Sequence, residues 1–593
     1  MKHFDRWLNV AVNTLEQLSI QAQRPNSCTS SYPAQQPSSA PTVPEQHEPM
    51  PYYPNASYSR LVYPSNGQLV YTPYNEWGDR ILDFSGAGYN EGYTGLPSVP
   101  IVAYLDPTAP DNDETDRIQQ AINNVSRRPL QADGFRGALQ LNRGTWTISR
   151  ALEIHASGVV LQGDPAGGTV LVAAHTMGRG AQFIRVAGEA NVMAKKRLPI
   201  RNKSIPVAGR HVEVDASAAK HLRVGQAVVV AVNFNDAWIK AIGMDVIHPK
   251  GNLNKNNGWK PGKFEHLRRI VAIQNTTIVL NEPLTTRLAA DYGGGHIEAY
   301  ENKRVQRVGI QFLECICPAN QNRGPDEIMQ EEKGKVKDYR FAAELFDHLL
   351  ISMDHAENCW VQQVRSVWWR NFIRLGTNTV AITLKRCQHT FPQHDIPQNK
   401  IKLPLAGQFA FEISGQLVLI EECHAEYSFH AYSYKGRVPG PNVVYQSTCI
   451  AKNGDVGPHM KWSSGQLYDS CNIEGQMIIQ DRFDAGSGHG WSGANSVVWN
   501  TVAHAGMVVQ NPPLAQNFLI GSSSKRGKIR MPEHEWAFTE SPDQKVNPPS
   551  LYMAQKQIRM EKSCQTRIQQ HEKRETILEV GLQLLRLIII GYS

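Results

Sequence analysis

One short pattern repeats through the second half of the chain, and it limits the possible folds more than any other feature. An apolar strand residue is followed, three positions later, by Cys or Val, and the intervals between these last members are 23, 36, 26, 22 and 31 residues. Coils of a parallel β-helix take roughly 20 to 30 residues each, and longer coils extrude loops. We therefore expect a β-solenoid whose coils carry these pairs: Val361/Val364, Leu384/Cys387, Ile420/Cys423, Gln446/Cys449 (the weakest), Tyr468/Cys471 and Trp499/Val502.

Four cysteines of the repeat lie at equivalent positions in this interpretation, namely Cys387, Cys423, Cys449 and Cys471. A small thiol fits where equivalent residues of successive coils lie one strand spacing apart. We expect these cysteines to form an inward stack of unpaired thiols. The alternative is that scattered core cysteines match the spacing by chance.

The first half begins with a different signal. Residues 111–125 place Ile118, Ala121, Ile122 and Val125 on one helical face, and acidic residues fill the first turn. From 137 to 172, short apolar strands recur every seven to eleven residues between Gly, Asn or Ser. A helix followed by many short strands is typical of an end-capped β-solenoid.

Residues 190–297 break this rhythm with longer strands and hairpin-like turns, which predict a small antiparallel β domain inserted between early coils. Its Trp238 and Trp259 have two interpretations, contact with substrate or burial in a core.

The expected organisation is an N-terminal segment with a disordered Pro/Ser-rich linker (1–56), capping helix and first coils (57–189), the insertion (190–297), the main coils with the site (298–549) and a charged helical tail (550–593). The tail has the composition of a packing helix, and an artefact of the gene prediction is the alternative.

Composition excludes several classes of protein. The net charge of +7 comes from Lys and Arg residues that are scattered, so no nucleic-acid partner is predicted. No apolar run reaches the roughly 18 residues that a membrane span needs. The N-terminal residues lack the apolar core of a signal peptide. The nine cysteines form no CxxC pair and no zinc spacing, so no metal site is predicted.

A family resemblance appears in the series DNDETDRIQQAI, GALQLNRGTWTIS and SGVVLQGD. This series resembles the opening of the pectate-lyase-like superfamily: an acidic turn, a short helix and a strand that ends in Pro-x-Gly-Thr-Tyr. Here Trp146 stands at the Tyr position. The stretch from 457 to 500 looks like an uncharacterised bacterial branch of these proteins. The resemblance implies a right-handed parallel β-helix and a secreted or periplasmic carbohydrate-active protein. It does not imply one reaction, because several chemistries share the fold.

Three consecutive coils each carry a His followed by an aromatic residue. His459 lies 12 residues before Cys471, and His489 lies 13 residues before Val502. His430 lies 19 residues before Cys449, and the loop 435–442 accounts for the difference. In a solenoid these offsets stack three imidazoles on one face. The alternative is that these residues are turn and core residues without a role in a site.

This cluster fits β-elimination on a uronic-acid polymer. Lys461 or Arg482 would neutralise the sugar carboxylate and acidify the adjacent C5 proton, which a neutral His or Tyr would remove. Hydrolysis would need two carboxylates across the bond, and no pair has a convincing spacing. Calcium-assisted chemistry would need several acidic residues on neighbouring coils, and no such set is evident, so no cofactor is predicted.

The expected function is therefore a polysaccharide lyase acting on an acidic polysaccharide, with a glycoside hydrolase or a non-catalytic adhesin as alternatives. An open groove is expected to hold the polysaccharide. The predicted catalytic residues are His430, His459, Lys461, Arg482 and His489, and the predicted substrate-binding residues are Glu426, Tyr427, Tyr432, Arg437, Trp462 and Trp491.

Overall fold

The computed structural model describes residues 53–174, 181–317, 349–392, 407–450 and 454–565. The chain divides into two compact units. One comprises residues 51–555, and the other comprises 1–50 with 556–593. All the features discussed below belong to the unit of residues 51–555.

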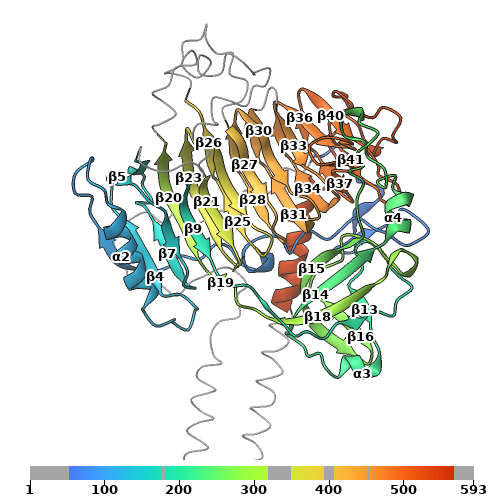
Figure 1. Cartoon of the computed structure of the whole chain (residues 1–593), viewed down its shortest axis with the longest axis horizontal. Coiled ribbons are helices and arrows are strands. Elements are labelled where there is room, and N and C mark those ends of the chain that lie inside the picture. The colour runs from blue at the N-terminus through green and yellow to red at the C-terminus, as the bar shows by residue number, and fades with distance from the viewer. Residues whose placement is uncertain (1–52, 175–180, 318–348, 393–406, 451–453, 566–593) are drawn as a thin grey trace, which may run out of the picture. The chain divides into compact units, whose positions relative to one another are not determined.

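Parallel strands of successive coils pair with each other to form a three-sided solenoid (Figure 1). The first side contains β3 (Ile101–Leu105), β4 (Gly137–Leu141), β7 (Val159–Gln162), β20 (Gly309–Ile316), β23 (Trp360–Val367), β25 (Thr383–Lys385), β28 (Leu419–Glu421), β31 (Pro439–Tyr445), β34 (Ser463–Asp469), β37 (Gly493–Ala494), β38 (Val497–Trp499), β41 (Phe518–Ile520) and β42 (Phe538–Glu540). The second contains β5 (Gly144–Ile148), β8 (Thr169–Ala173), β26 (Gln388–Thr390), β29 (His424–Glu426), β32 (Thr448–Ile450), β35 (Asn472–Ile473) and β39 (Val502–Ala503). The third contains β6 (Leu152–Ile154), β9 (Gln182–Ala187), β21 (Leu349–Asp354), β24 (Asn371–Leu375), β27 (Gly407–Ile413), β30 (Ser428–Tyr434), β33 (Asp455–Pro458), β36 (Gln476–Ile479) and β40 (Gly506–Val509).

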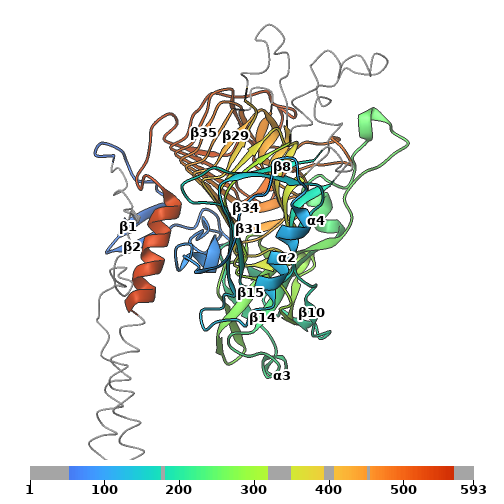
Figure 2. The ribbon, with the colours of Figure 1, turned by 90° about the vertical axis from the view of Figure 1, so that its left-hand side faces the viewer.

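Helix α2 (Thr115–Ser126) closes one end of the solenoid, where Figure 2 shows it nearest the viewer. Its Ile118, Ile122 and Val125 are buried in the same core as Leu139 and Ile154 of the first coils. The helix covers apolar side chains that the first coil would otherwise expose to water. The predicted right-handed parallel β-helix and its N-terminal capping helix are thus confirmed.

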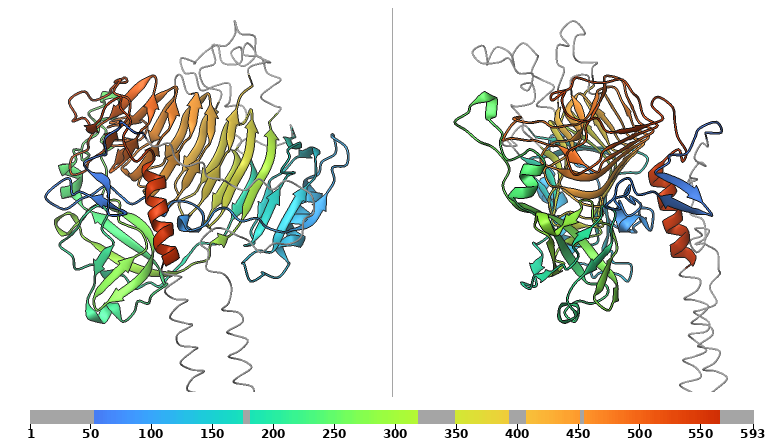
Figure 3. Two further views of the ribbon diagram at one scale, coloured as in Figure 1. Left: turned by 180° about the vertical axis from the view of Figure 1, so that it is seen from behind. Right: turned by 90° about the vertical axis from the view of Figure 1, so that its right-hand side faces the viewer.

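The insertion is an antiparallel sheet, as predicted. Strand β14 (Ala227–Phe234) lies between β15 (Gly262–Gln274) and β18 (Gly295–Glu301). Figure 3 shows this sheet, in green, beside the later coils. Its other elements are β10 (Val192–Met193), β11 (Leu198–Pro199), β12 (Ser204–Ile205), β13 (His211–Glu213), α3 (Ala216–Ala219), α4 (Asp236–Ala241), β16 (Thr277–Leu280), β17 (Leu288–Ala289) and the 3-10 helices η2 (Pro249–Gly251) and η3 (Ala290–Tyr292). Outside it lie β1 (Val62–Ser65), β2 (Gln68–Tyr71), η1 (Tyr89–Gly92), β19 (Val305–Gln306) and β22 (Ala356–Glu357).

The inward stack follows a register that differs in part from the prediction. Strand pairing aligns Val361, Leu384, Ile420, Val444, Tyr468 and Val498 in one row. The third residue after each of the last five is Cys387, Cys423, Ser447, Cys471 and Thr501. All four predicted cysteines are buried and unpaired, as expected.

Two members of the predicted register are wrong. Cys449 lies on β32, where it pairs with Ala425, and Val502 pairs with Asn472. Ser447 and Thr501 hold the equivalent places because their hydroxyls accept hydrogen bonds from the previous coil. Cys423 N–H donates to Ser447 Oγ at 3.2 Å, and Cys471 N–H donates to Thr501 Oγ1 at 3.1 Å. The stack is therefore a ladder of small hydrogen-bonding side chains and not of thiols alone.

Both predicted terminal boundaries need correction. Tyr53 and Ala56, assigned to the linker, accept hydrogen bonds through their carbonyl groups from the side chain of Asn547. A helix begins at 551, and its Tyr552 and Gln555 are buried. Buried Asp469 accepts a 2.8 Å hydrogen bond from Tyr552 N–H. The tail predicted to start at 550 therefore contributes its first turn to the solenoid. Residues 1–52 and 566–593 lie outside the described residues.

The ladder predicts how position 471 tolerates substitution. Cys471→Ser should cost about 1 kcal/mol or less, because its neighbours in the ladder, Ser447 and Thr501, already carry hydroxyls. Cys471→Leu should cost about 1–3 kcal/mol through overpacking. Urea denaturation of both variants measures the difference. Equal losses for Ser and Leu would show that the position does not require a small hydrogen-bonding group.

Candidate functional site

The structure brings the three predicted histidines together. His430 lies on β30, His459 follows β33, and His489 lies in a hairpin loop whose strands meet at Asp481 and Trp491. The ring centroids of His430 and His459 lie 4.5 Å apart, and those of His459 and His489 lie 4.9 Å apart. With Thr501 as the ladder residue, His489 lies 12 residues before it, the same offset as His459 from Cys471. The corrected register therefore explains the stack better than the predicted one.

Asp455 holds His430 in place at one end of the stack. Asp455 of β33 is the register partner of His430, and its Oδ1 lies 2.5 Å from His430 Nδ1. Arg482 approaches the other oxygen, Oδ2, at 3.8 Å. Burial alone would raise the pKa of Asp455, but the charge and hydrogen bond of His430, together with Arg482, lower it. Asp455 is therefore a carboxylate that orients His430.

The other two imidazoles are held neutral. Burial lowers the pKa of His459 to about 2, and the charges of His430 and Arg482 add to the effect. Burial also lowers the pKa of His489 to about 4, with Arg482 and Lys461 as further causes. A neutral imidazole has a free lone pair and can accept a proton. Nδ1 of His459 and Nδ1 of His489 are buried without a hydrogen-bond partner among the described residues.

Cationic residues lie beside the stack, Arg482 through a side-chain contact and Lys461 and Arg437 through backbone contacts. Arg482 Nη1 donates to the His459 carbonyl at 3.2 Å. Lys461 N–H donates to the His489 carbonyl at 3.0 Å, and its own carbonyl accepts from Arg437 N–H at 2.8 Å. Burial and the neighbouring Arg437 lower the pKa of the Lys461 ammonium. Arg437 is exposed, and its guanidinium lies 5.1 Å from the ring centroid of Phe234 in the inserted sheet.

A cavity of about 330 Å³ opens beside Asp455 and Arg482. Gln476, Gln480, Lys528 and Arg530 also line it. The sequence prediction missed Asp455, Lys528 and Arg530. Asp455 lies 25 residues after His430, which is about one coil, so an acidic residue at coil spacing from a histidine was the available signal. Lys528 and Arg530 follow the last ladder residue, and no pattern in the sequence points to them.

Three of the predicted substrate-binding residues are in the core, and this part of the prediction is wrong. Tyr432 is 1% exposed, packs on Phe411, and places its hydroxyl 2.8 Å from the Thr448 carbonyl. Trp462 and Trp491 are each 1% exposed. Trp462 meets Trp238 edge-on with ring centroids 4.8 Å apart, and Trp491 Nε1 donates to the Ile242 carbonyl at 3.1 Å.

These tryptophans hold the inserted sheet against the coils. Both belong to the same apolar cluster as Trp238, Trp259 and Phe264 of the insertion. The insertion also donates a hydrogen bond to the coils. Trp259 Nε1 donates to the Gly488 carbonyl, one residue before His489, at 3.2 Å. Trp238 and Trp259 are thus core residues as well. A ring enclosed in this way cannot stack on a sugar.

Glu426 and Tyr427 lie in another group of side chains. Glu426 accepts a hydrogen bond from Phe391 N–H at 2.9 Å and lies 3.5 Å from His424. Tyr427 packs partly against Trp368 and Phe391. Among the described residues, no hydrogen bond, ion pair or ring contact joins either side chain to the histidine stack. Their predicted role in the same groove has no support from these contacts.

Within the described ranges, no group of three or more His, Cys, Asp or Glu side chains is arranged to hold a metal ion. In the same ranges, no helix combines the length and the apolar character needed to cross a membrane.

The histidine environment predicts a pH dependence of stability. Because the folded pKa values of His459 and His489 lie below the unfolded value of about 6.5, the unfolded chain binds more protons under mildly acidic conditions. Stability should therefore fall as the pH is lowered from about 6.5 toward 4, by up to about 1.4 kcal/mol per pH unit for each imidazole. Urea denaturation across this range measures the slope, which His459→Gln and His489→Gln should each reduce. An NMR titration that protonates either ring near pH 6.5 in the folded protein would contradict the prediction.

The docking role of the tryptophans predicts large losses of stability. Trp462→Ala and Trp491→Ala should each lower the free energy of unfolding by about 3–5 kcal/mol, since each leaves a cavity in a packed interface. Thermal and urea denaturation measure this loss. Trp77→Ala is the matched control, because this ring is 46% exposed and its removal should cost much less. Unchanged stability in the Trp462 and Trp491 variants would return these rings to the list of candidate ligand contacts.

Comparisons with known proteins give little further information. No family model matches the chain, and no curated protein matches it. Among solved structures, the chain is similar to the tailspike gp49 of Pseudomonas phage LKA1, with 9% identity, a TM-score of 0.34 and coverage of 68% of this chain and 56% of that chain. It is also similar to the Gp54 tailspike of Acinetobacter baumannii bacteriophage AP22 in complex with capsular saccharide, with 9% identity, a TM-score of 0.33 and coverage of 70% and 61%. A tailspike variant of E. coli bacteriophage HK620 in complex with pentasaccharide has 11% identity, a TM-score of 0.34 and coverage of 78% and 61%. The chain thus spans less than two thirds of each of these tailspikes, and the assignment of its fold rests on its own strand pairing.

Proposed function

We propose that the protein is a polysaccharide lyase that cleaves an acidic, uronate-containing polysaccharide at the histidine stack. The observation that carries this proposal is the pair of neutral imidazoles, His459 and His489, beside the cations Arg482 and Lys461. Proton abstraction next to a carboxylate needs both elements, a neutral base and a positive charge that neutralises the carboxylate. A secreted or periplasmic location belongs to the same proposal.

The reaction assigns a role to each group. Arg482 binds the uronate carboxylate and makes the C5 proton more acidic. His459 or His489 takes that proton, the C4–O bond breaks, and a C4=C5 double bond forms. The leaving oxygen takes a proton from the Lys461 ammonium, whose lowered pKa makes it a better acid. His430 and Asp455 do not touch the substrate in this scheme. They hold the other histidines of the stack in position.

A hydrolytic mechanism fits this cluster less well. Hydrolysis uses a protonated carboxyl as the acid and a second carboxylate as base or nucleophile. The pKa of Asp455 is lowered, so this side chain is ionised at neutral pH and cannot serve as the acid. Glu412, the nearby carboxylate on β27, is paired with Arg374 and Lys435.

The proposal predicts the products of the reaction. The full-length protein, incubated with a panel of anionic and neutral polysaccharides, should release reducing ends together with the ultraviolet absorbance of unsaturated uronates. Lys461→Ala and Arg482→Ala should each lower kcat/KM about a hundredfold, because the first removes the acid that protonates the leaving oxygen and the second removes a charge that stabilises the transition state. The matched control is Arg365→Ala on β23, where Arg365 pairs with Glu314 at 3.0 Å outside the site.

The other possible outcomes distinguish the alternative functions and separate an effect on the fold from an effect on the site. Reducing ends without absorbance would identify a hydrolase, and retained binding without either product would identify an adhesin. An Arg365→Ala variant that loses as much activity as Lys461→Ala would show that the loss comes from the fold and not from the site. Thermal denaturation of all the variants separates the two causes.

A further inference from the structure

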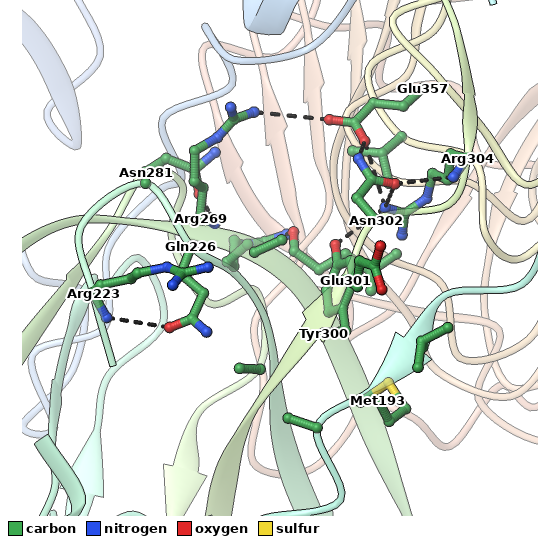
Figure 4. A pocket seen from close by; sticks show the side chains of 18 of the residues that line it. Met193, Arg223, Gln226, Arg269, Asn281, Tyr300, Glu301, Asn302, Arg304 and Glu357 are labelled. Atoms are coloured by element: carbon green, nitrogen blue, oxygen red, sulfur yellow. Dashed lines mark hydrogen bonds and ion pairs between the residues drawn. The ribbon is translucent and has the colours of Figure 1, made fainter. Parts of the chain in front are cut away.

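A second cavity, of about 730 Å³, lies between the inserted sheet and the coils. Its volume is in the range of small-molecule sites. None of the residues that line it belongs to the histidine stack. Figure 4 shows Arg223 and Gln226 on one side of this cavity and Tyr300, Asn302 and Arg304 on the other. The cavity is therefore a separate site with walls from two parts of the fold.

Arg304 is the most informative residue of this cavity. Its side chain is 1% exposed, and its Nε donates to the Asn378 carbonyl at 2.8 Å. Its Nη1 lies 3.1 Å from the Tyr300 hydroxyl and 3.5 Å from Glu357 Oε2. Its Nη2 is buried without a hydrogen-bond partner among the described residues. A buried guanidinium N–H without an acceptor is costly, which indicates that an acceptor from outside the chain completes this site.

The carboxylates of the cavity are already engaged by cations. Arg269 lies 2.6 Å from Glu91 and 3.8 Å from Glu357. Glu301 lies 2.5 Å from Lys303. The lining contains four arginines and three glutamates, so it carries a surplus of positive charge.

Two of the arginines, Arg268 and Arg223, form no ion pair with a carboxylate in the described part of the chain. Arg268 is buried, and all its hydrogen bonds go to neutral oxygens, such as the Pro283 carbonyl at 2.7 Å and the Gly440 carbonyl at 2.9 Å. Arg223 is exposed at the rim, and its side chain has no ion pair in the described part of the chain. Gln226, Asn281 and Asn302 add neutral groups that can bind hydroxyls.

We propose that this cavity binds a small anion that also carries hydroxyl groups, namely a sugar acid or a sugar phosphate. The anionic group would lie between Arg304 Nη2 and Arg223, and the amides of Gln226, Asn281 and Asn302 would bind the hydroxyls. The site would act independently of the lyase chemistry, because it shares no lining residue with the histidine stack.

Isothermal titration calorimetry of the full-length protein tests this inference with glucuronate, glucose 6-phosphate, glucose and inorganic phosphate. One of the two anionic sugars should bind saturably at millimolar or lower concentration, and glucose should not. Arg304→Gln and Arg223→Gln should each raise the Kd about tenfold or more, since each removes a charged donor. Arg201→Gln is the matched control on the same inserted domain, because Arg201 pairs with Asp215 at 2.5 Å and does not line the cavity.

The exposed Arg223 keeps the test decisive if Arg304→Gln fails to fold. Unaltered affinity in Arg223→Gln would overturn the inference, as would equal binding of glucose. Binding of neither anionic sugar would overturn the inference as well. If inorganic phosphate binds as tightly as the sugar ligands, the site recognises an anion alone, and the proposed recognition of hydroxyls is wrong.

Discussion

The register between successive coils is the constraint on which the rest of this structure depends. Parallel strands pair about 4.8 Å apart, so each residue lies almost directly over its equivalent one coil earlier. The ring centroids of His459 and His489 lie 4.9 Å apart, which matches this spacing, whereas the register partner of His430 is Asp455 and not His459. The register is maintained by backbone pairing and by the inward ladder, in which Ser447 and Thr501 accept N–H groups from the neighbouring coil. A shift of one residue would turn His430 toward the core and Ala431 outward.

The inserted sheet changes what the coil register alone would produce. Trp462 and Trp491 would be exposed on a bare solenoid, as would the loop that carries His489. Packing against Trp238 and Trp259 removes those rings from water, and it also fixes the hairpin that positions His489 and Arg482. The insertion therefore supports the candidate site structurally, although its tryptophans do not line it. The same junction between sheet and coils encloses the cavity that contains Arg304.

The sequence was sufficient to predict features that depend on periodicity. The coil architecture, the capping face of Ile118 and Ile122, and the stacking of His459 on His489 all follow from spacing. The prediction was wrong for residues whose burial depends on contacts with distant parts of the chain and not on spacing. The Trp491 side chain bonds to a carbonyl 249 residues earlier in the chain, and no local pattern encodes that burial. The repeat pattern of Cys or Val does not include Ser447, because the ladder requires a small group that accepts a hydrogen bond and not a particular residue type.

The electrostatics of the site couple substrate binding to proton transfer in the proposed reaction. Arg482 and Lys461 are among the causes that lower the pKa of His489, and Arg482 also lowers that of His459. In the free protein these imidazoles are neutral but weak bases. A uronate carboxylate that binds Arg482 would offset this positive charge and raise the pKa of both imidazoles, while burial, the largest cause, would continue to lower it. The base would thus become stronger only when a substrate with the required charge is present. A neutral sugar would leave the histidines as weak bases, which links specificity for acidic polymers to catalysis through the same arginine.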